Sequence, residues 1–94
     1  NIAIMNIDEL FKVIEDRTKS KNKKSYTNKL LKMGPNKIAQ KIGEESTELI
    51  IDYLNGSKKR TIEEAADLIY HLLVMLKSKK INLNDIYKEL AKRK

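Results

Sequence analysis

The chain of 94 residues contains no cysteine, which excludes disulfide bonds and metal sites built from thiolates. A chain without cysteine fits a reducing compartment, so we expect a cytoplasmic protein. Long apolar runs are also absent: the longest, residues 68–76, is about half of what a bilayer span requires. The apolar opening, residues 1–5, is too short for the core of a signal peptide. We therefore expect a soluble protein with no membrane partner.

Aromatic residues are scarce, with four tyrosines, one phenylalanine and no tryptophan, although the chain carries a net charge of +7. A basic chain of this kind is compatible with a nucleic-acid-binding module, because lysine and arginine neutralise phosphates. Such modules, however, often interleave aromatic side chains on which bases stack. We therefore expect no nucleic-acid partner and interpret most lysines as solvated surface, with some available to an anionic small molecule. A basic helical nucleic-acid-binding module is kept as the alternative.

The alternation of apolar and polar residues that is typical of half-buried strands is absent, and the apolar spacing is helical almost throughout. We predict an all-α fold, an antiparallel helical bundle of four to five helices in one domain, residues 1–94. The polar segment 19–24 is predicted to be a mobile loop. The expected helices lie at about residues 7–17, from a cap at Ser25 or Thr27 to Gly34, at 35–54, from a Thr61/Glu64 capping box to 77, and at 83–90.

The core of so short a chain is thin, because a domain of this size buries only about two thirds of the surface that its unfolded chain exposes. The fourth expected helix is apolar around most of its circumference over residues 68–76. A monomer would leave part of that surface uncovered, so we expect a two-fold homodimer that completes the bundle. Basic residues of segment 19–29 in one subunit would then approach the acids of the other.

Three glutamates, Glu44, Glu45 and Glu48, gather directly ahead of an apolar run. On a helix Glu45 and Glu48 are neighbours on one face, and Glu44 lies beside Glu48. Like charges at this spacing repel one another, which favours a compensating cation. The alternative is a solvated face whose charge is neutralised by surface ion pairs with Lys37 and Lys41.

A second acidic pair, Glu64 and Asp67, lies in the fourth expected helix, whose other residues are mostly apolar. Burying a carboxylate without a partner is costly, and a short connection places this helix antiparallel to the preceding one. We therefore predict that these oxygens converge with those of Glu45 and Glu48. Hard oxygen donors without cysteine favour Mg²⁺ or Mn²⁺. The nearby His71 is interpreted as a hydrogen-bonded core histidine, with a catalytic role as the alternative.

The acidic pattern, E-E-x-x-E at residues 44–48 followed by E-x-x-D at 64–67, resembles that of the all-α, MazG-like nucleoside triphosphate pyrophosphohydrolases, whose four acids bind Mg²⁺. The stretches SYTNKLLKMGPNKIAQKIGEESTELI and EEAADLIYHLLVML are similar to the phosphoribosyl-ATP pyrophosphohydrolase family of histidine biosynthesis, over about residues 10–90. In that family S-Y-T, K-x-x-Q-K-x-G-E-E and E-A-A-D-L-x-Y-H recur in this order. Ser46 and Asp52 depart from its pattern, and neither is a proposed ligand.

The resemblance implies Mg²⁺-dependent hydrolysis of phosphoribosyl-ATP to phosphoribosyl-AMP and pyrophosphate. A relative that cleaves ordinary or damaged nucleoside triphosphates is the nearest alternative. The predicted metal ligands are Glu45, Glu48, Glu64 and Asp67, and the predicted catalytic residues are Glu44 and Glu45, with Glu44 either a fifth ligand or the base. The predicted substrate-binding residues are Arg17, Ser25, Tyr26, Thr27, Lys29, Lys37 and Lys41. Helix capping is the alternative for Ser25 and Thr27, and surface ion pairing is the alternative for the two lysines of the third expected helix.

Overall fold

The computed structural model describes residues 4–20 and 25–94 of the chain. Five α-helices and no strands occur within these ranges, which confirms the predicted all-α fold. Residues 21–24 of the predicted mobile loop lie outside the described residues. The helices are α1 (Ile7–Lys19), α2 (Tyr26–Met33), α3 (Pro35–Asn55), α4 (Lys58–Ser78) and α5 (Leu83–Lys92).

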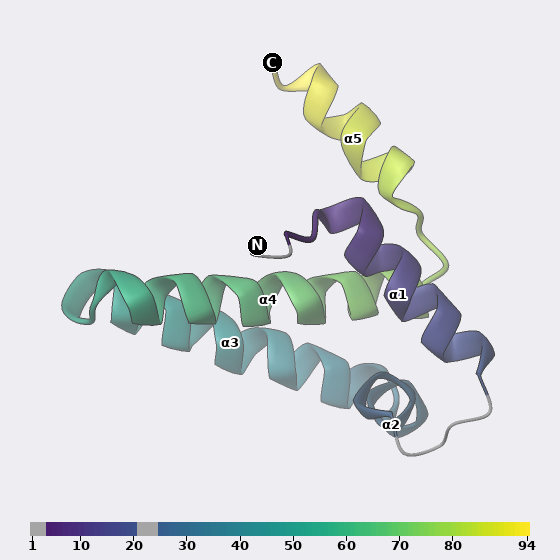
Figure 1. The fold of residues 1–94 in the computed structure, drawn as a ribbon, viewed down its shortest axis with the longest axis horizontal. Helices are drawn as coiled ribbons and strands as arrows, with labels where there is room; N and C mark the ends of the chain where they lie inside the picture. The colour runs from purple at the N-terminus through teal and green to yellow at the C-terminus, as the bar shows by residue number, and fades with distance from the viewer. Residues whose placement is uncertain (1–3, 21–24) are drawn as a thin grey trace.

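The two long helices α3 and α4 run antiparallel and lie side by side, as the short connection between them predicted (Figure 1). Helices α1 and α2 pack against one end of this pair, the end far from the α3–α4 turn. Helix α5 points away from the other helices. Its base is held by the buried side chain of Leu83 and by a hydrogen bond of 2.8 Å from the Tyr87 hydroxyl to Asp8.

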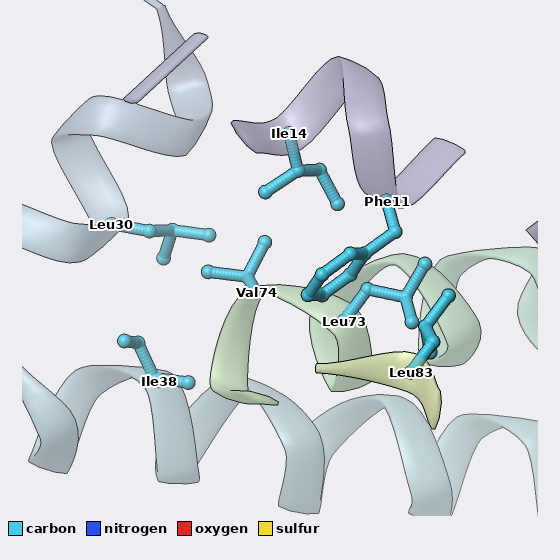
Figure 2. Packing of buried hydrophobic residues seen from close by; sticks show 7 residues of the cluster. All are labelled: Phe11, Ile14, Leu30, Ile38, Leu73, Val74 and Leu83. Carbon is cyan, nitrogen blue, oxygen red and sulfur yellow. The ribbon is translucent and has the colours of Figure 1, made fainter. Parts of the chain in front are cut away.

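The buried apolar core lies where α1 and α2 cover the α3–α4 pair (Figure 2). Every helix contributes to it, since periodic apolar positions on each one face the same centre. At the other end of the pair, around the α3–α4 turn, large apolar side chains are instead more than half exposed. The core residues are Phe11, Ile14, Leu30, Ile38, Leu73, Val74 and Leu83. The exposed residues, called the turn-end patch below, are Ile50, Ile51, Tyr53, Leu54 and Ile62.

Helix α4 begins at Lys58, so the prediction that a Thr61/Glu64 capping box starts it is wrong. Ser57 is the N-cap, and its hydroxyl oxygen accepts a hydrogen bond of 3.1 Å from the backbone N–H of Arg60. Gly56 makes the early start possible, because a Cβ at this position would lie 2.7 Å from the Asp52 carboxylate. Thr61 therefore lies inside the helix, where its hydroxyl donates to the Ser57 carbonyl oxygen at 2.9 Å.

Replacing Ser57 with alanine should lower the free energy of unfolding by about 1 kcal/mol, because the first turn of α4 loses its side-chain acceptor. Thr61→Val is the matched control. It removes a hydroxyl that donates only to the carbonyl oxygens of Asp52 and Ser57, earlier in the chain, so it should lower the free energy of unfolding by less. Urea unfolding of both variants, followed by circular dichroism, compares the two costs. A larger loss for Thr61→Val would place the cap at Thr61 instead.

No helix in the described part of the chain is long and apolar enough to cross a membrane. The single domain over residues 1–94 and the cytoplasmic location stay predictions. Helix α4 is covered only in part, since Leu73 and Val74 are buried whereas Leu72 is 42% exposed. The predicted dimer interface on this helix thus has exposed apolar surface available to it.

Candidate metal and substrate site

Three carboxylates from the two long helices come together at the α3–α4 contact. Glu45 and Glu48 lie one turn apart on α3, and Glu64 faces them from α4. One oxygen from each side chain lies within 4.8 Å of one oxygen from each of the others. Glu45 and Glu64 are buried, at 7% and 4% exposure, whereas Glu48 is exposed. The cluster is therefore buried on the side of Glu45 and Glu64 and open on the side of Glu48.

Two of these carboxylate oxygens are buried without a hydrogen-bond donor. They are Oε2 of Glu45 and Oε2 of Glu64, neither of which has a partner among residues 4–20 and 25–94. A buried carboxylate oxygen without a donor costs desolvation free energy that a bound cation would offset. An all-oxygen donor set is the kind that Mg²⁺ and Mn²⁺ prefer, so the residues fit such an ion.

Asp67, the predicted fourth ligand, is not part of this three-carboxylate group. Its side chain is exposed on α4, one turn after Glu64. It still lies close enough for its charge to contribute to raising the pKa of the Glu64 carboxyl. The structure thus brings together three of the four predicted ligands, and the role of Asp67 stays a prediction.

Burial raises the pKa of the Glu64 carboxyl above its ordinary value, and the Glu48 carboxyl beside it raises the pKa further. The nearby Arg60 guanidinium acts in the opposite direction. The pKa of Glu44 is lowered, chiefly because the Gln40 side chain donates a hydrogen bond of 2.7 Å to it. Glu44 is therefore a stable carboxylate at the outer edge of the cluster, whereas burial disfavours the charge of Glu64.

In the metal-free protein, Glu64→Gln should raise the free energy of unfolding at neutral pH. Because the folded state raises the pKa of Glu64, this group contributes stability that is fully present below its ordinary pKa of 4.5. That contribution is lost as the pH rises through the raised value, and the neutral amide avoids the loss. Urea unfolding in EDTA, repeated from neutral to acidic pH, should show the advantage of Glu64→Gln shrinking on acidification. An advantage independent of pH would contradict the assignment.

Arg60 is a site residue that the sequence analysis missed. Its guanidinium donates to Glu64 at 2.5 Å and to Glu63 at 3.0 Å, and it also lies 3.8 Å from Asp52. The pKa of Arg60 is raised, first by the hydrogen bond to Glu63 and then by the charge of Glu64. One oxygen of Glu64 thus has a cationic partner from the chain itself. The three- and four-residue spacing from Arg60 to these glutamates was the available signal.

The two predicted lysines of α3 lie on the same helix as the glutamates, one and two turns earlier. The Lys41 ammonium is 3.8 Å from both Glu44 and Glu45, so the ion pairs considered as its alternative role are present. Lys37 is half-buried, and its charge contributes to lowering the pKa of Glu44. Both lysines add positive charge at the rim of the cluster, and their contact with substrate stays a prediction.

The predicted residues before and within α2 have different environments. Ser25 is the N-cap of α2, and its hydroxyl oxygen accepts a hydrogen bond of 3.1 Å from Asn28 N–H. Thr27 is fully buried, and its hydroxyl is hydrogen-bonded to the Tyr70 hydroxyl. Arg17 and Lys29 are exposed near the two ends of the segment that lies outside the described residues. The capping role is therefore confirmed for Ser25 only.

Tyr26 connects α2 to α4. Its hydroxyl is 2.8 Å from Nε2 of His71, whose Nδ1 is 2.8 Å from the backbone oxygen of Asp67. His71 is buried at 6% exposure, which confirms the interpretation of a hydrogen-bonded core histidine. Tyr26 itself is 46% exposed, so of the two residues it is the one that a ligand can reach.

Comparisons with known proteins identify the family of this chain. The family model described as phosphoribosyl-ATP pyrophosphohydrolase matches residues 7–94. The chain is 49% identical to a phosphoribosyl-ATP pyrophosphatase of Sulfolobus acidocaldarius over 87 residues, covering 93% of this chain and 92% of the relative. A Clostridium botulinum phosphoribosyl-ATP pyrophosphatase is 47% identical over 88 residues, or 94% of this chain and 80% of the relative. The histidine biosynthesis bifunctional protein HisIE of Prochlorococcus marinus is 48% identical over 86 residues, covering 92% of this chain and 38% of that protein. With nearly all of its length matched, and with the acidic cluster at the α3–α4 contact, the chain belongs to the phosphoribosyl-ATP pyrophosphohydrolase family.

Proposed function

We propose that this chain hydrolyses the α–β phosphoanhydride of phosphoribosyl-ATP to phosphoribosyl-AMP and pyrophosphate, the second step of histidine biosynthesis, with Mg²⁺ as cofactor. The observation that carries the proposal is the pair of buried carboxylate oxygens without donors, on Glu45 and Glu64, in a chain of this family. Mn²⁺ is the other ion that suits the same oxygen donors.

Glu45, Glu48 and Glu64 would hold the ion, and Asp67, one turn beyond Glu64, is the proposed fourth ligand. When bound, such an ion acts as a Lewis acid on phosphate oxygens, orients the substrate and lowers the pKa of water. The buried position of Glu45 and Glu64 keeps these two carboxylates fixed between the helices. Glu48, on the exposed side, leaves an approach for the triphosphate.

Three further charged side chains of α3, those of Lys37, Lys41 and Glu44, act in substrate binding and proton transfer in this proposal. Glu44 lies outside the three-carboxylate group, and its lowered pKa keeps it ionised. We therefore propose that Glu44 is the base that accepts a proton from the attacking water. A further ligand role is the alternative for this residue. Lys41, now paired with Glu44 and Glu45, and Lys37 one turn earlier would neutralise phosphate oxygens.

Turnover of phosphoribosyl-ATP compared with that of a panel of deoxynucleoside triphosphates tests the substrate assignment. Pyrophosphate release with Mg²⁺ should give a kcat/KM at least about a hundredfold higher for phosphoribosyl-ATP, because binding to the added phosphoribosyl group favours it. Equal or faster release from the deoxynucleotides would assign the chain to the house-cleaning type of activity. Affinity for duplex DNA that falls steeply with salt, without any Mg²⁺-dependent product, would support the basic nucleic-acid-binding module instead.

The proposed assembly is a two-fold homodimer. The sequence placed its interface on residues 68–76 of α4, whereas the support in the structure is the turn-end patch, in which five large apolar side chains of α3 and α4 are each more than half exposed. Surfaces of this kind are usually covered, and a two-fold interface is the commonest closed arrangement. Ile51, which belongs to the patch, lies three residues after Glu48 and so on the same side of α3, and a second subunit there would border the open side of the acidic cluster.

A further inference from the structure

A chain of hydrogen bonds connects the exposed first residue of α2 to the backbone of α4 beside the acidic cluster. It runs from the Tyr26 hydroxyl to His71 Nε2, and from His71 Nδ1 to the Asp67 carbonyl oxygen, with both distances 2.8 Å. The rings of Tyr26 and Tyr70 each meet the imidazole edge-on, with centroids 5.7 and 5.3 Å away. These contacts fix the imidazole in one orientation.

The chemistry of the partners decides where each proton lies. A backbone carbonyl oxygen only accepts hydrogen bonds, so His71 Nδ1 must carry the proton and donate it to Asp67. In a neutral imidazole the other nitrogen, Nε2, then only accepts. The Tyr26 hydroxyl therefore donates its one proton to Nε2. Its oxygen is left with lone pairs alone for any further partner.

Tyr26 also lies close enough to the proposed active site for charges of its residues to act on the hydroxyl. Burial raises the pKa of the Tyr26 hydroxyl, and the nearby charges of Lys41, Glu45 and Asp67 influence it as well, Lys41 in the opposite direction. Tyr26 is 46% exposed, so a ligand can reach this residue. Through His71, the phenolic oxygen is thus joined as an acceptor to the backbone of Asp67, the proposed fourth ligand of the cluster.

We propose that His71 is a positioning residue that makes Tyr26 an acceptor-only group, and that this group binds a ribose hydroxyl of the nucleotide. Phosphate oxygens are acceptors too, so they gain nothing from an oxygen that has no proton to offer them. Ribose hydroxyls are donors that a phosphoribosyl nucleotide brings close to its phosphates. The identity of the nucleotide rests on the proposed function, whereas the direction of the hydrogen bonds does not.

The position of the imidazole proton is directly measurable, because His71 is the one histidine of the chain. Long-range ¹H–¹⁵N correlation spectra of the metal-free protein at neutral pH should show Nδ1 protonated and Nε2 bare. In Tyr26→Phe the Nε2 signal should move, since it loses its donor, while the Nδ1 signal stays. A proton on Nε2, an imidazolium ring, or an Nε2 signal unchanged by Tyr26→Phe would overturn the proposal.

Two substitutions of the histidine separate positioning from simple core filling. Glutamine at this position, His71→Gln, carries an amide oxygen that reaches the place of Nε2 and still accepts from Tyr26. Asparagine, His71→Asn, keeps only the donor to the Asp67 carbonyl. We expect Tyr26→Phe and His71→Asn to raise KM for phosphoribosyl-ATP about tenfold with a smaller change in kcat, as for one lost hydrogen bond. His71→Gln should stay within about threefold of the parent chain.

Tyr87→Phe is the control, since it removes a tyrosine hydroxyl bound to Asp8, away from the cluster, and should leave KM unchanged. Equal damage from His71→Gln and His71→Asn, or an unchanged KM in Tyr26→Phe, would show that His71 only fills the core. If His71→Asn does not fold by circular dichroism, the spectra and Tyr26→Phe still decide. Absence of hydrolysis in the parent chain would refute the proposed function but leave the imidazole spectra as an independent result.

Discussion

Changing Glu48 to glutamine should lower kcat/KM for phosphoribosyl-ATP by roughly a thousandfold, because a ligand worth several kcal/mol of transition-state stabilisation is removed. Glu48 is the exposed member of the three-carboxylate group, so its replacement disturbs the core least. The amide has almost the same shape and lacks the charge that the proposed ion requires. The measurement is pyrophosphate release under saturating Mg²⁺, with circular dichroism to confirm the helical fold.

Glu63→Gln is the matched control for this prediction. Glu63 is a glutamate like Glu48 and is the neighbour of Glu64 in the chain. Its carboxylate pairs with Arg60 at 3.0 Å, but it lies outside the three-carboxylate group. We expect its activity to stay within about threefold of the parent chain, as for an exposed ion pair. Equal losses in Glu48→Gln and Glu63→Gln would mean that general negative charge, and not a ligand position, supports the activity.

A double substitution in the turn-end patch, Ile50→Glu with Leu54→Glu, should convert the proposed dimer into a monomer at micromolar concentration. The two side chains are 58% and 68% exposed and lie one turn apart on α3. Each change counts twice in a two-fold interface, so the loss of apolar burial amounts to several kcal/mol. The dimer dissociation constant should rise at least roughly a thousandfold. Sedimentation equilibrium measures it.

Leu90→Glu is the control for assembly, because Leu90 is also exposed, at 57%, but lies on α5 outside the patch. It should leave the dissociation constant unchanged. A parent chain that sediments as a monomer at micromolar concentration and retains full activity would contradict the dimer and the site shared between subunits. Loss of the dimer in Leu90→Glu alone would move the interface to α5.

The helices were predictable from the sequence where a strong local signal marks their ends. Gly34, at φ 93°, followed by Pro35 separates α2 from α3 as expected. The N-cap of α4 was misplaced by four residues, at Thr61 and not at Ser57, because the basic stretch 58–60 resembles a loop in composition, although Ser57 is an equally good cap. The same error hid Arg60, which pairs with Glu63 and Glu64 only once it is inside the helix.

The site was predictable to the extent that helical spacing controls it. Glu45 and Glu48 are neighbours through their spacing, and the antiparallel turn adds Glu64. Which further acid joins them depends on the rotation of α4 about its own axis, which no spacing rule specifies, and Asp67 stays outside the group. The bond between Tyr26 and His71 joins residues 45 positions apart, and only the packing of α2 on α4 produces it.

Restoring Mg²⁺ to metal-free protein tests most directly whether the carboxylates of α3 and α4 form the active centre. After EDTA treatment and removal of the chelator, pyrophosphate release from phosphoribosyl-ATP is followed as Mg²⁺ is added back, for the parent chain and Glu48→Gln. We predict no release without the ion, saturable recovery in the parent chain, and almost none in the variant at the same concentrations. Full release by the parent chain in EDTA, or identical recovery by Glu48→Gln, would contradict the account.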